Sequence, residues 1–207
     1  MKAMKKALGK LLLTLTVTGC ISCQKPESLK GKEYLAYIED KDNGLKKKVR
    51  AGDLNFTFQY KPAEYVFLKE YGGEAKNEKL LFERQRGLSN TVWFNVSISG
   101  LKTKTDPLRT GVADLNEYNA RNDYFLMNAM KDFKLIYGNV EMVTAGYHFE
   151  NNYGLTPMDV MIIGFAIPDS VPVHEMTLVY NEQVFNNGLI KANFSEDDLL
   201  SIPKLDY

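Results

Sequence analysis

The sequence predicts an α+β domain, a mostly antiparallel β-sheet with one long helix, at about residues 114–134, packed on it. Short segments in which apolar and polar residues alternate lie both before and after a single long segment in which apolar residues recur every three or four positions. Clusters of Gly, Pro, Asn and Asp separate the segments, and the sequence contains no internal repeat. Strands grouped on either side of one helix favour an antiparallel sheet covered by that helix.

The first half of the domain is expected to be mostly strand. The clearest case is 90–99, where Val92, Phe94, Val96 and Ile98 share one face and Trp93 lies on the other. Residues 45–50 follow a turn cluster and carry four basic side chains, which is typical of an exposed edge strand. The weak alternation of 79–86 favours a strand over a helix. The expected elements are strands at 34–39, 45–50, 53–60, 79–86 and 90–99, and a short helix from Pro62 to about Glu70.

The second half begins with the long helix and continues as strands. The helical segment has apolar or aromatic residues at Leu115, Tyr118, Phe125, Ala129 and Phe133. The run 160–167, VMIIGFAI, is the most apolar stretch after the N-terminus and predicts a central strand that is buried on both faces. Further strands are expected at 134–137, 140–150, 175–180 and 188–194, followed by a short helical turn that Ser195 caps.

Length and composition indicate one domain, at residues 33–207, that is held together by its hydrophobic core. Removal of residues 1–19 leaves 188 of the 207 residues, with 22 basic and 26 acidic side chains and a net charge of −4. A mildly acidic domain without a long basic face is not expected to bind nucleic acid. The two cysteines are both at positions 20–23, so the domain has neither a disulfide framework nor a cysteine-ligated zinc site.

The N-terminus has the pattern of an export signal. Lys2, Lys5, Lys6 and Lys10 precede the short apolar run 11–18, which is below the length of about 20 residues that spans a bilayer. Residues 17–20, Val-Thr-Gly-Cys, resemble the lipobox of bacterial lipoproteins. The resemblance covers residues 1–25 and implies a signal peptide at 1–19 and an acylated Cys20. Residues 20–32 would then be a lipidated tether that anchors the domain to the outer membrane, on either its periplasmic or its outer side.

Three alternatives to this interpretation remain. Cys23 also follows a small residue and could be the acylated cysteine in place of Cys20. A plain secretory signal would leave neither cysteine acylated, and a cytosolic amphipathic helix would leave the segment uncleaved. The polar stretch that follows, QKPESLKGK at 24–32, has the composition of a tether in either exported form.

Four residues are candidates for a functional site. His148 and Glu150 lie two positions apart on one predicted strand, so they share a face and could act as metal ligands or as an acid–base pair, with His174 as a third member. The ordinary interpretation is a polar strand face and a loop histidine. Trp93 could stack on a sugar ring if its face of the strand reaches solvent, or belong to the core if the helix covers it. No cofactor is expected, because the nucleophile, dinucleotide and zinc-protease motifs are missing from the sequence.

The expected function follows from the anchor and from the missing catalytic motifs. The leading hypothesis is a non-enzymatic lipoprotein of the cell envelope that acts as a binding or assembly module with an envelope protein partner. A surface accessory protein that binds a glycan or peptide through Trp93 is the first alternative. An envelope hydrolase is the second alternative, and it would need His148, Glu150 and His174 to cluster.

Overall fold

The computed structural model of the chain describes residues 26–72, 78–88, 90–102, 104–168 and 172–206. Cys20 and Cys23, and with them the predicted signal peptide and acylation site, lie outside the described residues. Within the described residues, no helix has both the length and the apolar character needed to cross a membrane.

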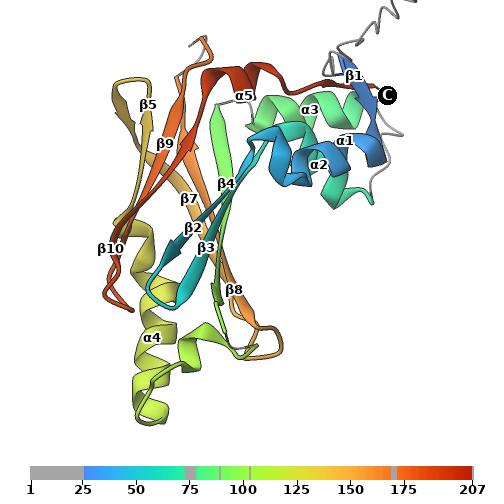
Figure 1. Cartoon of the computed structure of the whole chain (residues 1–207). Coiled ribbons are helices and arrows are strands. Elements are labelled where there is room, and N and C mark those ends of the chain that lie inside the picture. Colours follow the sequence, from blue (N-terminus) through green and yellow to red (C-terminus); the bar gives the residue numbers. More distant parts are fainter. Residues whose placement is uncertain (1–25, 73–77, 89, 103, 169–171, 207) are drawn as a thin grey trace, which may run out of the picture.

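Two antiparallel sheets dominate the fold (Figure 1). In the first, the strand order is β2-β3-β4-β8-β7, and in the second it is β10-β9-β5-β6. The five strands of the first sheet are β2 (Lys46–Ala51), β3 (Leu54–Lys61), β4 (Thr91–Gly100), β8 (Met158–Ala166) and β7 (Thr144–Glu150). The four strands of the second are β10 (Gly188–Phe194), β9 (Met176–Glu182), β5 (Phe133–Tyr137) and β6 (Val140–Met142).

The sheets pack face to face through aromatic side chains. Phe56 of β3 contacts Tyr180 of β9 with 6.1 Å between ring centroids, and Phe94 of β4 contacts Phe194 of β10 at 5.4 Å. These four rings are fully buried. The prediction that β4 is a half-buried strand is therefore confirmed. Its apolar face forms the core, and its polar face points away from the second sheet.

Helices α1 (Gly31–Glu39), α2 (Ala63–Glu70) and α3 (Glu78–Leu88) gather on the side of the five-stranded sheet that faces away from β5, β9 and β10 (Figure 1). Pro62 immediately precedes α2, and its fixed φ of −56° turns the chain from β3 into the helix. The short helix predicted from Pro62 to Glu70 is therefore confirmed. The small helix α5 (Glu196–Leu200) has its predicted cap, since the Ser195 hydroxyl accepts a hydrogen bond from the Asp198 N–H at 3.1 Å.

The α+β class is confirmed, but the prediction of one long helix is wrong. Helix α4 (Leu115–Met127) begins at the expected place, where the Asp114 carboxylate accepts a hydrogen bond from the Glu117 N–H. It ends after 13 residues, and a 3-10 turn at 129–132 leads directly into β5. The apolar stripe continues past the helix because Ala129 and Phe133 are both buried, one in the turn and one in the strand.

Two predicted strands are helices. Residues 34–39 belong to α1, where Tyr34 and Ile38, four residues apart, are buried on one face. The aromatic and branched residues that suggested a strand supply that face, so packing overrides their strand propensity. Residues 79–86 belong to α3.

Residues 28–32, which were predicted to belong to the tether at 20–32, are part of the fold. Residues Ser28–Lys30 form strand β1, which pairs in parallel with the C-terminal strand β11 (Lys204–Asp206). The described chain is therefore folded from Ser28 onward, and the two ends of the domain lie side by side.

Candidate ligand-binding groove

The outer face of the five-stranded sheet, the face turned away from the second sheet, carries a row of four residues in register. Lys61 of β3 pairs with Trp93 of β4, Trp93 pairs with Gly164 of β8, and Gly164 pairs with Gly146 of β7. A Cβ placed on Gly164 would lie 2.8 Å from the six-membered ring of Trp93, and one on Gly146 would lie 2.9 Å from it. The indole therefore lies directly against the backbone of β8 and β7, where only glycine leaves room for it.

The adjacent row supplies the polar floor. Gln59, Asn95, Ile162 and His148 pair across the sheet, and Glu150 follows His148 on the same face of β7. The Gln59 amide is used inside the fold, because its Nε2 donates to the carbonyl oxygen of Ile38 at 2.7 Å. Asn95 and Glu150 remain as polar groups that face outward beside the indole.

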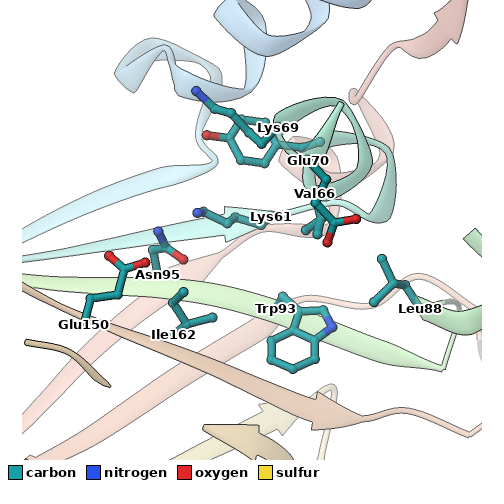
Figure 2. Close-up of a pocket in the computed structure, with 10 residues that line it drawn as sticks. Lys61, Val66, Lys69, Glu70, Leu88, Trp93, Asn95, Glu150 and Ile162 are labelled. Carbon is teal, nitrogen blue, oxygen red and sulfur yellow. The ribbon is translucent and has the colours of Figure 1, made fainter. Parts of the chain in front are cut away.

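Helix α2 forms a wall above this floor and encloses a groove of about 450 Å³ (Figure 2). In Figure 2, Val66, Lys69 and Glu70 lie on the helix side of the groove, and Trp93, Asn95 and Ile162 lie on the sheet side. A smaller hollow of about 230 Å³ continues from the groove toward β2 and shares Lys61, Tyr65 and Asn95 with it. The complete lining of the groove is Lys61, Tyr65, Val66, Lys69, Glu70, Leu88, Trp93, Asn95, Glu150 and Ile162.

Ion pairing fixes one edge of the groove. Lys69 Nζ lies 2.6 Å from Glu39 Oε1, and the Tyr65 hydroxyl donates to the same oxygen at 2.8 Å. The hydrogen bond from Lys69, followed by the one from Tyr65, holds the pKa of the Glu39 carboxyl below its ordinary value. Burial, reinforced by the neighbouring Glu39 carboxylate, raises the pKa of the Tyr65 hydroxyl, so this group is a neutral donor.

Lys61 is the second cation of the groove, and its surroundings differ. Its ammonium lies 5.3 Å from the centre of the Tyr65 ring. Among the residues that the structure describes, no carboxylate forms an ion pair with it. Burial lowers the pKa of Lys61 from 10.5 to about 8, and the attraction of Glu150 opposes this shift only in part.

Two buried polar atoms of the groove have no hydrogen-bond partner within the described part of the chain. They are the indole Nε1 of Trp93 and the side-chain oxygen of Asn95. A buried donor or acceptor without a partner costs about 1–3 kcal/mol, so such groups are normally satisfied by water or by a ligand. The floor of the groove therefore contains an unsatisfied donor and an unsatisfied acceptor, both buried, next to an aromatic ring and an ammonium.

The four residues singled out in the sequence divide into two places. Trp93 and Glu150 both line the groove, and His148 is exposed on β7, the strand that also carries Glu150. His174 lies elsewhere, against Tyr137 with 5.8 Å between ring centroids and with its Nδ1 3.7 Å from a Glu196 carboxylate oxygen. The described residues include no group of three or more His, Cys, Asp or Glu side chains that could hold a metal ion.

Of the residues that line the groove, only Trp93 and Glu150 were predicted as site residues, and Lys61, Tyr65 and Asn95 are among those that were not. Lys61 directly follows the strand expected at 53–60, Tyr65 lies in the short helix expected from Pro62 to about Glu70, and Asn95 lies in the strand expected at 90–99. The register of β3 against β4 brings Lys61 beside Trp93, and that register is not visible in the separate segments. The two glycines, 146 and 164, carry a sequence signal, since glycine inside a strand often marks a close approach.

Comparisons with known proteins do not assign the chain to a family. No protein-family model matches it, and no curated protein matches it. Among solved structures, it is similar to a DUF4426 family protein from Pseudomonas aeruginosa PAO1, with a TM-score of 0.35 and 7% sequence identity, over 72% of this chain and 91% of that one. A likeness this weak supports no argument about fold or function.

Proposed function

We propose that this protein is a lipid-anchored, non-catalytic binding module of the bacterial cell envelope, and that its groove binds a saccharide. The observation that carries the proposal is the placement of Trp93. Its indole lies flat on the glycines of β7 and β8, is only partly buried, and lines an open groove next to polar atoms without partners. An aromatic ring beside hydrogen-bonding groups suits the apolar face and the hydroxyl groups of a sugar.

The topology favours a sugar over an extended peptide. A peptide that binds along a sheet usually adds a strand at an open edge, where backbone groups are unpaired. The floor of this groove is β4, which is hydrogen-bonded to β3 on one side and to β8 on the other. A ligand at this place must therefore be recognised by side chains alone, as sugars commonly are.

The binding proposal is tested on a glycan array with the full-length protein in detergent. The parent should be retained on a defined set of glycans, and Trp93→Ala should lose that retention. Tyr153→Asn is the matched control, because Tyr153 is 74% exposed and does not line the groove. Retention of Trp93→Ala equal to that of the parent, or no retention of the parent on any glycan, would refute the saccharide proposal.

The anchor rests on the lipobox resemblance and is tested separately. Replacement of Cys20 and Cys23 together by alanine should release the protein from membranes, because acyl chains supply about 0.8 kcal/mol per buried methylene and the described residues include no spanning helix. The two single substitutions identify which cysteine is acylated. A double variant that still sediments with membranes after a carbonate wash would contradict the proposed anchor.

A further inference from the structure

We propose that the groove selects sugars that carry a carboxylate, with the Lys61 ammonium binding the carboxylate and the Trp93 indole supporting the ring. This inference rests on the proposed saccharide-binding function and assigns its ligand class. It makes Lys61, which no sequence motif marked, the residue that determines specificity.

The fold fixes the position of Lys61 beside Trp93 and Tyr65. It is the last residue of β3 and pairs with Trp93 of β4, so the two side chains emerge next to each other on the outer face. Pro62 then turns the chain into α2, which puts the Tyr65 ring 5.3 Å from the ammonium. Figure 2 shows the Lys61 side chain extending along the groove, with its nitrogen on the side where Asn95 and Glu150 lie.

The charges around the groove leave this ammonium open to an anion. Lys69 is already paired with Glu39 at 2.6 Å, whereas Lys61 has no ion-pair partner among the described residues. Glu150 attracts it, but from beyond ion-pair distance. At pH 7 the ammonium is still mainly protonated, because its pKa is about 8. A half-buried, unpaired ammonium is costly in the free protein and gains a partner when a carboxylate binds.

The rest of the groove suits a sugar ring around that carboxylate. Trp93 lines the groove with its indole ring, and the side chains of Asn95 and Glu150 line the same groove and carry polar groups for the ring hydroxyls. The groove of about 450 Å³ and the adjoining hollow of about 230 Å³ give room for a short oligosaccharide rather than a single ring alone. A neutral sugar would fill the same space but leave the ammonium without an anionic partner, so it should bind more weakly.

The test compares uronic acid oligosaccharides with their neutral counterparts. Oligomers of galacturonate, glucuronate and mannuronate, and the matching oligomers of galactose, glucose and mannose, are titrated into the full-length protein in detergent at pH 6.5. The change in fluorescence of Trp93, which is the one tryptophan of the sequence, reports binding inside the groove. At least one acidic oligomer should bind about 10-fold or more tightly than its neutral partner, as expected for a charge-assisted hydrogen bond in a partly buried site.

Two variants assign the preference to a residue. Lys61→Met keeps the length and apolar stem of the side chain, and it should bring the affinity for the acidic sugar down to that for the neutral one. Lys48→Met is the matched control, because Lys48 is exposed on the same sheet face at β2 but does not line the groove. The control should keep the full preference.

The outcomes separate this inference from the function on which it rests. Equal affinities of the parent for acidic and neutral sugars would refute the carboxylate selectivity and leave saccharide binding standing. A preference that survives in Lys61→Met would refute the role of Lys61. Binding of none of the sugars would overturn both the selectivity and the proposed function.

Discussion

The contact between Trp93 and the glycine of β8 yields the sharpest structural prediction. A Cβ at Gly164 would lie 2.8 Å from Cε3 and Cζ3 of the indole, whereas carbon atoms in contact are normally 3.5–4.0 Å apart. In Gly164→Ala the ring must therefore move away from the sheet by roughly 0.7–1.2 Å. Overpacking of this kind costs about 1–3 kcal/mol, and the better strand propensity of alanine returns about 0.5–1 kcal/mol. We expect a net loss of about 1 kcal/mol in the free energy of unfolding, within the range of roughly 0–2.5 kcal/mol that the two contributions allow.

Urea denaturation followed by circular dichroism measures this loss, and the emission of Trp93 reports the displaced ring in the same samples. The variant should also lose affinity for the ligand of the groove, because the indole no longer lies at the level of the floor. Gly87→Ala is the control, since a Cβ at that helical glycine meets nothing within 4 Å. It should be neutral or stabilising. Unchanged stability together with unchanged emission in Gly164→Ala would show that the indole does not rest on these glycines.

Three further substitutions test the charges of the fold by denaturation at several pH values. Lys61→Met should stabilise the protein by about 1–2 kcal/mol at pH 7, because burial lowers the pKa of Lys61 from its ordinary value of 10.5 to about 8 in the folded protein. The free energy of unfolding of the parent, but not of the variant, should rise between pH 8 and pH 10.5. A destabilised variant would contradict this. Glu182→Ala should cost about 2–4 kcal/mol, because this buried carboxylate accepts the N–H groups of Val184, Phe185 and Asn187; a loss no larger than that of an exposed glutamate would contradict it. Burial, with the charge of Asp106, raises the pKa of Asp159 from 3.8 to about 7, so the unfolded chain releases this proton at lower pH than the folded protein does. The free energy of unfolding of the parent should therefore fall by up to roughly 4 kcal/mol between pH 4 and 7. Asp159→Asn should remove this pH dependence, and an identical pH dependence in the variant would refute the shift.

Much of the sheet could be predicted from alternation alone. In 53–60 and 90–99 one face is consistently apolar, and both segments are strands whose apolar face lies in the core between the sheets. The run 160–167 is also a strand as far as Ala166, but the prediction that it is buried on both faces is wrong. Met161, Ile163 and Phe165 are buried on the inner face, whereas Val160 and Ile162 on the outer face are half-buried and Ala166 is exposed. Pairing order was not predictable, because any two strands of the same alternation can pair until turns and packing select one register.

The helices were harder to predict because their apolar residues are few. In α1 only Tyr34 and Ile38 are buried, and their spacing of four residues matches one face of a helix. The six residues 34–39 are too few to distinguish this pattern from that of a strand. The α4 segment shows the opposite error. Its apolar spacing continues through Phe133, but the chain leaves the helix after Met127 while the same side chains stay in the core. Periodicity therefore reports which residues are buried more reliably than the secondary structure that buries them.

The groove shows why a site can be half visible in a sequence. Trp93 was recognisable as a candidate because it is a lone tryptophan on the polar face of a strand. Its exposure depends on glycines 53 and 71 residues further along the chain, at 146 and 164, and its cationic neighbour Lys61 lies 32 residues before it. None of the positions 61, 146 and 164 indicates a site by itself. Only the register of the four strands β3, β4, β8 and β7 places the two glycines under the indole of Trp93 and Lys61 beside it. The Lys61 ammonium is the part of this arrangement that stability does not explain, because burial disfavours its charge and an apolar residue at 61 should make the fold more stable. A chain that keeps an unpaired ammonium next to an indole on bare backbone is therefore better explained by a ligand than by stability.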